Sequence, residues 1–255
     1  MLAGAAFAAT LCVIENRRFG VIEAAFALCY TEEKNFAEAT RMAIILLIRH
    51  AANDAMGKWL AGWTPGVHLN EAGRRQAEAL AERLAPLPIR AIYSSPLERA
   101  LETAEPLARR KGLEIQIVPE LGEVRYGDWT GKSLKRLRRQ KAWQRLVGTI
   151  SRACFPGGEA MVDLIARAVR AVETIAARHP RDVVALFTHA DLIRAVTAYY
   201  LGMPLDLYHR LMIAPASVTI FWLAEGPPLL LRLNDTGPLQ WPLEDLAYLS
   251  KARKR

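Results

Sequence analysis

The sequence predicts an α/β fold, a three-layer helix-sheet-helix arrangement with a mainly parallel sheet, an antiparallel edge and a small inserted lid. Three observations favour this class. Apolar runs alternate with segments whose apolar residues recur at helical spacing, as in parallel sheets joined by helices. The run 42–48 has no period-two alternation, which favours a strand covered on both faces. With 255 residues, 52% of them hydrophobic, the chain can bury a large core.

The other elements are expected in a regular order after this first strand. They are a helix over 71–85, a strand over 89–94, a helix over 96–110, a short strand near 114–118, a helix over 159–178, a strand over 182–187, a helix beginning after His189, and a hairpin of strands 217–223 and 228–233. Ser95 to Glu98 has the pattern of a capping box, with Pro at the first helical position. One face of the 71–85 helix collects Ala77, Leu80, Ala81 and Leu84, and one face of the 159–178 helix collects Val162, Ile165, Val169, Val172 and Ala176.

Charged and imidazole side chains follow the ends of these strands. Arg49 and His50 end the first strand, His189 follows 182–187, and Arg99 stands in the first turn of the 96–110 helix. Ligands of open parallel sheets bind beyond the carboxyl ends of the strands. Two Arg and two His side chains at one edge supply concentrated donors for a phosphate dianion. The sequence therefore predicts an anion site at this edge.

Four segments together resemble the motifs of the histidine phosphatase superfamily, which has the phosphoglycerate-mutase-like fold. The first is Arg49-His50-Ala51, similar to the family's Arg-His-Gly, and the second is Ser95-Pro96-Leu97-Glu98-Arg99-Ala100-Leu101-Glu102-Thr103-Ala104. The third, Leu121 to Gly131, resembles the segment that carries the family's proton-donating acid, here Glu123, and the fourth is Thr188-His189. The resemblance covers roughly residues 42 to 236 and favours the phosphatase branch.

The resemblance implies chemistry through a phosphorylated histidine. His50 would attack phosphorus, Glu123 would protonate the leaving oxygen and later activate water, and Arg49, Arg99 and His189 would hold the phosphate oxygens. Asn53 occupies a position where the family often has a Ser or Thr that contacts phosphate. No metal and no cofactor are expected, and the sequence has no Walker-type loop.

Other residues near these motifs have two interpretations. Trp59 and Trp63 follow the nucleophile and either line the non-phosphate end of the substrate or pack in the ordinary way. We interpret Asp191 as a cap of its helix. Ala51 replaces the usual glycine, which is a modest change only if the backbone φ there is negative.

The expected function is hydrolysis of a phosphomonoester, with a small phosphorylated metabolite as substrate, by a metal-independent histidine acid-type phosphatase. A phosphoglycerate mutase is the alternative, and a non-catalytic module that binds a phosphorylated ligand is the second. Intact His50 and Glu123 argue against the last of these. The substrate identity is open, and so is a homodimer.

The net charge of +8 does not predict a nucleic-acid partner, because it is concentrated in two segments. Lys132 to Arg145 holds seven basic residues and no acidic one, and the tail 241–255 adds Lys251, Arg253, Lys254 and Arg255. Without these eleven, 23 basic residues face 26 acidic ones. We expect 132–145 to be an amphipathic helix of the lid with a solvated basic face, over the apolar residues Leu134, Leu137, Trp143 and Leu146.

Three regions are expected: residues 1–41 as an N-terminal extension, 42–240 as the catalytic domain with a lid over about 119–157, and 241–255 as a basic tail. A mis-assigned translation start at Met1 is our first interpretation of 1–41, an accessory helical extension the second and export the third. The apolar run Met1 to Ile14 is too short for a membrane span, so no membrane partner is expected. Three cysteines without framework spacing favour the cytoplasm.

Overall fold

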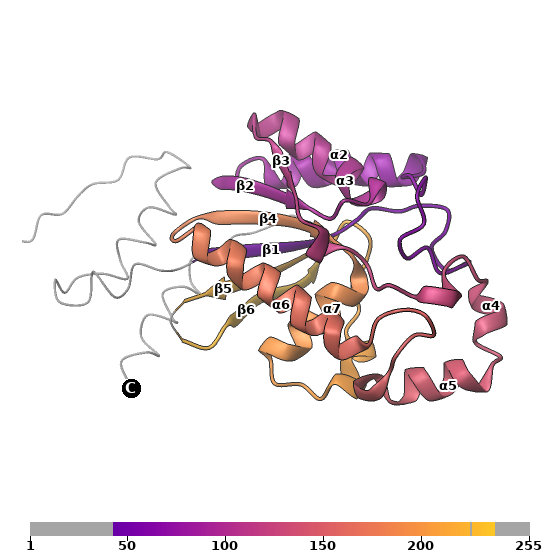
Figure 1. The fold of residues 1–255 in the computed structure, drawn as a ribbon. Coiled ribbons are helices and arrows are strands. Elements are labelled where there is room, and N and C mark those ends of the chain that lie inside the picture. The colour runs from indigo at the N-terminus through magenta and orange to yellow at the C-terminus, as the bar shows by residue number, and fades with distance from the viewer. Residues whose placement is uncertain (1–42, 225, 238–255) are drawn as a thin grey trace, which may run out of the picture. The chain divides into compact units, whose positions relative to one another are not determined.

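A six-stranded sheet forms the centre of the part of the chain that the computed structural model describes, residues 43–224 and 226–237 (Figure 1). The strand order is β3-β2-β4-β1-β5-β6. The first four of these pair in parallel, whereas β5 pairs antiparallel with both β1 and β6. The strands are β1 (Ala43–Arg49), β2 (Ile89–Ser94), β3 (Ile115–Ile117), β4 (Val183–Thr188), β5 (Val218–Leu223) and β6 (Leu229–Asp235). The predicted mainly parallel sheet with an antiparallel edge is confirmed.

Helices cover both faces of this sheet and so complete the three predicted layers. Figure 1 shows α2 (Glu71–Leu84) and α3 (Glu98–Lys111) on one side, and α6 (Met161–Arg178) and α7 (Ala190–Tyr200) on the other. The strands β1 and β4 are buried along nearly their whole length because both of their faces meet a helical layer. The core against α6 and α7 is built from alternate strand residues, including Ile45, Leu47, Val184 and Leu186.

The segment between β3 and α6 interrupts this alternation with short helices. It contains the 3-10 turns η1 (Pro119–Leu121), η2 (Gly127–Trp129) and η3 (Ile150–Arg152), and the helices α4 (Leu134–Leu137) and α5 (Lys141–Gly148). Its apolar residues join α6, α7 and the turn η4 (Leu205–Arg210) in a second cluster. That this segment acts as a lid remains a prediction.

The basic stretch 132–145 forms two helices, α4 and α5, and not the single helix predicted from the sequence. Its helical conformation breaks between α4 and α5, where Gln140 has extended backbone angles. The predicted apolar face is nevertheless correct, because Leu137 is buried and Leu134, Trp143 and Leu146 pack against the second cluster. Burial of this face therefore needs no continuous helix.

Two details of the predicted helices are wrong. The capping box does not form: α3 begins at Glu98, Ser95 N donates to the Phe187 carbonyl, and Glu98 Oε1 accepts from Gly66 N. Val162 is 53% exposed, because the buried face of α6 at this end consists of Met161, Leu164 and Ala168. Within the described residues, none of the helices has both the length and the apolar character needed to cross a membrane.

Candidate active site

The strand register brings three predicted segments together at one edge of the sheet. Arg49 at the end of β1 pairs with Thr188 at the end of β4, and Ser94 at the end of β2 pairs with Phe187. Backbone bonds continue this pattern by one residue, since His50 N donates to the Thr188 carbonyl over 2.9 Å. The rings of His50 and His189 consequently lie with centroids 5.2 Å apart.

His50 is held with one nitrogen available. Its Nδ1 lies 2.7 Å from the carbonyl oxygen of Ala51, so Nδ1 must carry the proton and donate it. In a neutral imidazole this leaves the lone pair on Nε2. Burial, and then the charges of Arg99 and Arg49, lower the pKa of His50 well below 6.5, so the ring is neutral near pH 7. The φ angle of Ala51 is not positive, so the methyl group that replaces the family's glycine causes no backbone strain.

Arg49 and Arg99 each have one buried nitrogen atom without a hydrogen-bond partner in the described part of the chain. Arg49 Nη1 donates to the Ile213 carbonyl and Arg99 Nη2 to the Gly62 carbonyl. Arg49 Nε and Arg99 Nη1 are buried without a hydrogen-bond partner among the described residues. Unpaired buried donors of charged groups are costly, so two of them beside His50 indicate a place for an anion.

Ser95 orients His189 at the same edge. The Ser95 hydroxyl accepts a bond from Leu97 N and lies 2.8 Å from His189 Nε2, to which its proton can be donated. His189 would then carry its own proton on Nδ1, which is buried, unpaired and 3.8 Å from Glu123 Oε2. Burial, Arg99 and His50 lower the pKa of His189 well below 6.5, so its ring is neutral near pH 7.

Glu123 is a buried carboxyl with a pKa near neutrality. Burial first and the negative charge of Asp191 second raise its pKa from 4.5 to about 7, against the opposing effects of Arg99, the Val124 N–H and Arg49. Its backbone carbonyl accepts from Trp63 Nε1 and from Arg167 Nη2 on α6. Glu123 is therefore fixed by its main chain, and its side chain accepts a bond from Val124 N through Oε1, which leaves Oε2 to carry a proton.

The predicted site residues do not all face the same space. Arg49, His50, Asn53, Trp59, Arg99 and Glu123 line a cavity of about 160 Å³. Asn53 Oδ1 accepts from Ala55 N and Met56 N, which leaves its amide N–H groups for another acceptor. Trp63 and His189 are not among the lining residues. Trp63 packs against Gly122 and supports the backbone of Glu123, whereas His189 lies beside His50 with its Nε2 next to the Ser95 hydroxyl.

Several residues that contribute to this cavity were not predicted from the sequence. Tyr126, Asp191 and Arg194 line it, and Ser95 and Arg167 hold His189 and Glu123. Asp191 is not a cap, since it accepts from the Tyr126 hydroxyl and from Arg194. Only the three-residue spacing of Asp191 and Arg194, on a helix that starts at the sheet edge, could have suggested this pair.

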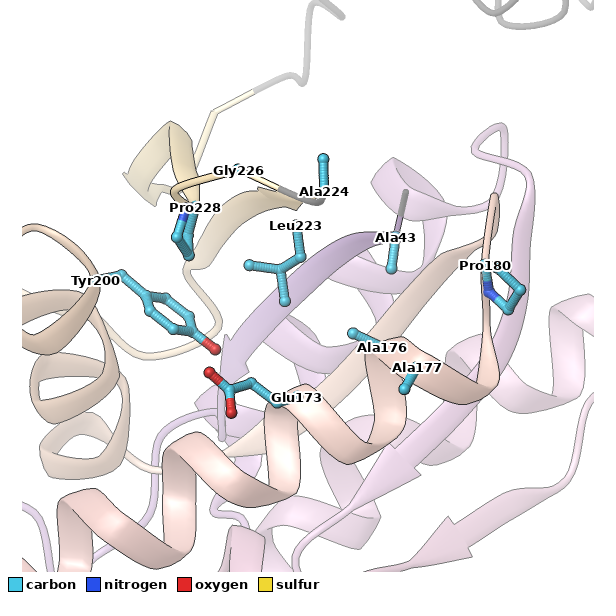
Figure 2. Close-up of a pocket in the computed structure, with 10 residues that line it drawn as sticks. All are labelled: Ala43, Glu173, Ala176, Ala177, Pro180, Tyr200, Leu223, Ala224, Gly226 and Pro228. Atoms are coloured by element: carbon cyan, nitrogen blue, oxygen red, sulfur yellow. The ribbon is translucent and has the colours of Figure 1, made fainter. Parts of the chain in front are cut away.

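A larger cavity of about 690 Å³ lies beside the start of β1 and the end of β5 (Figure 2). It is lined mostly by alanine, proline and leucine, and its lining includes no Arg, Lys or His among the described residues. In Figure 2 the Tyr200 hydroxyl and the Glu173 carboxylate point toward one another. Burial, followed by the charge of Glu173, raises the pKa of Tyr200. None of the described residues that line this cavity carries a positive charge that could hold a phosphate, despite the size of the cavity.

Residues 45–236 match the histidine phosphatase superfamily (branch 1). The chain belongs to this superfamily. The match spans all four motifs and every strand of the sheet except the start of β1. The described part of the chain contains no group of three or more His, Cys, Asp or Glu side chains placed to hold a metal ion.

Similar proteins include named phosphatases. The chain is 28% identical over 199 residues to phosphoserine phosphatase 1 of Hydrogenobacter thermophilus, covering 76% of this chain and 93% of the relative. It is 34% identical over 176 residues to glucosyl-3-phosphoglycerate phosphatase of Mycolicibacterium vanbaalenii, covering 65% and 77%. Among solved structures, YhfR of Bacillus stearothermophilus superposes with a TM-score of 0.71 at 29% identity, covering 76% and 97%. A mycobacterial glucosyl-3-phosphoglycerate phosphatase gives 0.68 at 30%, covering 76% and 99%.

Proposed function

We propose that this protein hydrolyses a phosphomonoester of a small metabolite through a phosphohistidine on His50. The observation that carries the proposal is the set of buried, unpaired nitrogens on Arg49, Arg99 and His189 around the free Nε2 of His50. They match the needs of a phosphoryl group, whose charge spreads over its equatorial oxygens during transfer. Membership of the superfamily and the names of the similar phosphatases support the same reaction class.

In the first step, His50 Nε2 forms a bond to phosphorus while the bond from phosphorus to the ester oxygen breaks. Glu123, protonated at and below about pH 7, gives its proton to the departing oxygen, and an alcohol leaves. Arg49, Arg99, His189 and the Asn53 amide hold the phosphoryl oxygens throughout. No metal is required, because Arg49 and Arg99 supply the positive charge.

In the second step, water attacks the phosphorus of the phosphohistidine. Glu123, now a carboxylate, takes a proton from this water, the bond between nitrogen and phosphorus breaks, and inorganic phosphate leaves. The acid and the base of the cycle are therefore the same residue. A pKa near 7 suits both roles, because each ionisation state is well populated near neutral pH.

The substrate class follows from the cavity and from the similar proteins. A cavity of about 160 Å³ is sized for a phosphoryl group and a small neighbouring part of the substrate. The named relatives act on phosphoserine and glucosyl-3-phosphoglycerate, both small phosphorylated metabolites. Release of free phosphate, without interconversion of 2- and 3-phosphoglycerate, would separate this proposal from the mutase alternative.

The test replaces His50 with Ala. We expect kcat/KM to fall by a factor on the order of 10³ or more, because the covalent route is lost. The wild-type enzyme, quenched during turnover, should carry an acid-labile and base-stable phosphoryl group that the variant lacks. His68→Ala is the matched control, since His68 is exposed and pairs with Glu102 away from the cavity. An acid-stable label, or substantial turnover by His50→Ala, would refute the phosphohistidine.

A further inference from the structure

We propose that Asp191 is a positioning residue for Glu123: its carboxylate, fixed in the same cavity, keeps Glu123 protonated and so equips the enzyme for alkyl phosphomonoesters. This inference rests on the proposed function, because it concerns the acid of that reaction. An alkoxide is a strongly basic leaving group and departs with a proton, whereas an aryl oxide can leave without one. Asp191 would thus set the pH range in which alkyl esters are cleaved.

The first support is the way in which the two segments meet. Tyr126 lies three residues after Glu123, and its hydroxyl donates to Asp191 Oδ2 over 2.8 Å. His189 lies two residues before Asp191, and its Nδ1 is 3.8 Å from Glu123 Oε2. The loop that carries Glu123 and the start of α7 therefore meet at two contacts, one through Tyr126 and one through His189. Glu123 and Asp191 both line the cavity.

The second support is that Asp191 is held in its charged form. Arg194 Nη1 donates to Oδ1 over 2.8 Å, and the Tyr208 hydroxyl is 3.4 Å from the same oxygen. Although burial opposes ionisation, Arg194 and the Tyr126 hydroxyl lower the pKa of Asp191 below 3.8. Arg194 is itself fixed, because its Nε donates to the Leu211 carbonyl. A buried carboxylate with this many donors remains ionised at neutral pH.

The third support is the balance of charges that face Glu123. Arg49 from β1 and Arg99 from α3 favour its carboxylate form, as does the Val124 N–H of its own loop. Burial and Asp191, at the start of α7, favour its neutral form, and the neighbouring His189 is itself uncharged. Arg194 also acts on Glu123, since the two interact electrostatically. Among these groups, Asp191 is thus the negative charge that opposes the effect of the arginines on the pKa of Glu123.

The test measures kcat/KM against pH for an alkyl ester, glycerol 2-phosphate, and an aryl ester, 4-nitrophenyl phosphate. In Asp191→Asn the alkaline limb for the alkyl ester should move down from about pH 7 by about one unit, because the arginines are no longer opposed. Its kcat/KM above neutrality should therefore fall by about tenfold, while that of the aryl ester changes little. The second ionisation of each ester's phosphate is the same for both enzymes, so comparing the variant with the wild type on each ester isolates the acid.

Two further variants test the inference, because they should affect the alkaline limb differently from Asp191→Asn. Arg194→Gln removes a neighbouring positive charge and should move the alkyl limb upward. Tyr126→Phe removes a hydrogen bond but no charge, and should leave the limb within a few tenths of a unit of the wild type. An equal loss for both esters with an unmoved limb in Asp191→Asn would overturn the inference, and so would a downward shift in Arg194→Gln. Failure of the proposed function would appear separately, as wild-type turnover that does not depend on His50.

Discussion

At the scale of one residue, the raised pKa of the Glu123 carboxyl affects both the proposed reaction and the free energy of unfolding. Its pKa is raised by burial and by Asp191 from 4.5 to about 7 in the folded protein. Between these two values the folded state binds more protons than the unfolded chain, so the free energy of unfolding falls as pH rises. The stability associated with Glu123 is fully present below about pH 4.5 and is lost as pH rises through about 7. Burying Glu123 thus lowers the free energy of unfolding at neutral and alkaline pH.

Glu123→Gln should therefore stabilise the protein while it inactivates it. At pH 8 the gain in the free energy of unfolding should approach about 3 kcal/mol, and it should disappear near pH 4. Hydrolysis of an alkyl ester should fall by roughly 10²-fold or more, as expected for loss of a general acid. Urea unfolding at several pH values, with kinetics on the same samples, checks both parts.

A matched control is Glu120→Gln, in the turn before Glu123 and with an exposed side chain. Its unfolding free energy should depend on pH as the wild type does. If Glu123→Gln gave the same gain at pH 4 as at pH 8, the gain would come from packing and not from ionisation.

Individual residues were predictable where a motif marks them. Arg49, His50, Arg99 and His189 come together because each stands at the end of a predicted strand or at the start of a helix. Glu123 lies six residues after β3, so only the resemblance to a family motif marked it. Their roles remain proposals. The contact between Tyr126 and Asp191 has no local signal, since the two residues meet only after the loop and α7 pack together.

At the scale of elements, α2 supports the loop that follows His50. Asn70 N donates to the Ala52 carbonyl, and Gln76 Oε1 accepts from Ala52 N. Gly73 faces the same carbonyl: a Cβ at this position would lie 2.0 Å from Ala52 O. Since that neighbour is backbone, a side chain at 73 would force the helix and the loop apart. The absence of a side chain at Gly73 thus helps to place Asn53 in the cavity.

Gly73→Ala should lower the free energy of unfolding by about 1–3 kcal/mol, the usual cost of overpacking, in spite of alanine's better helix propensity. It should also raise KM, because the loop that carries Asn53 is displaced. Thermal unfolding and phosphate-release kinetics measure the two effects. Arg75→Ala, on the exposed side of the same helix, should change stability by no more than about 0.5 kcal/mol. An unchanged or higher melting temperature in Gly73→Ala would show that the helix and loop tolerate the methyl group.

Most elements were predictable because their apolar residues repeat with the right period. Helices and strands begin and end within a few residues of the expected positions, and Ala77, Leu80, Ala81 and Leu84 are all buried. The predicted start of α3 was wrong because the Ser95 hydroxyl bonds to His189. This contact joins the ends of the neighbouring strands β2 and β4, so a local sequence pattern does not reveal it. The break in 132–145 was missed for a similar reason, since two short helices bury the same apolar residues as one.

At the scale of the whole molecule, the fold class was predictable because strands alternate with helices and a hairpin follows. The strand order was not predicted, since β4 lies between β1 and β2 although these two strands are consecutive in the sequence. The size of the cavities was not, and the larger one is not the one that collects the charged groups. A homodimer, a cytoplasmic location and the action of the segment 119–157 as a lid remain predictions. The expectations for residues 1–41 and for the tail 241–255 fall outside the described residues.

The last prediction concerns residues 1–41. We propose that the chain from Met42 onward is sufficient for folding and activity, because all described strands and every site residue lie between residues 43 and 237. Deleting 1–41 should therefore leave kcat/KM for the alkyl ester within about twofold and the urea unfolding transition cooperative, with an unchanged midpoint. If the deletion instead exposed apolar surface, each Å² would cost roughly 25 cal/mol, so a loss of about 100 Å² would lower the unfolding free energy by about 2.5 kcal/mol. An insoluble or inactive truncated protein would contradict the proposal, whereas the role of His50 would still be judged by His50→Ala in the full chain.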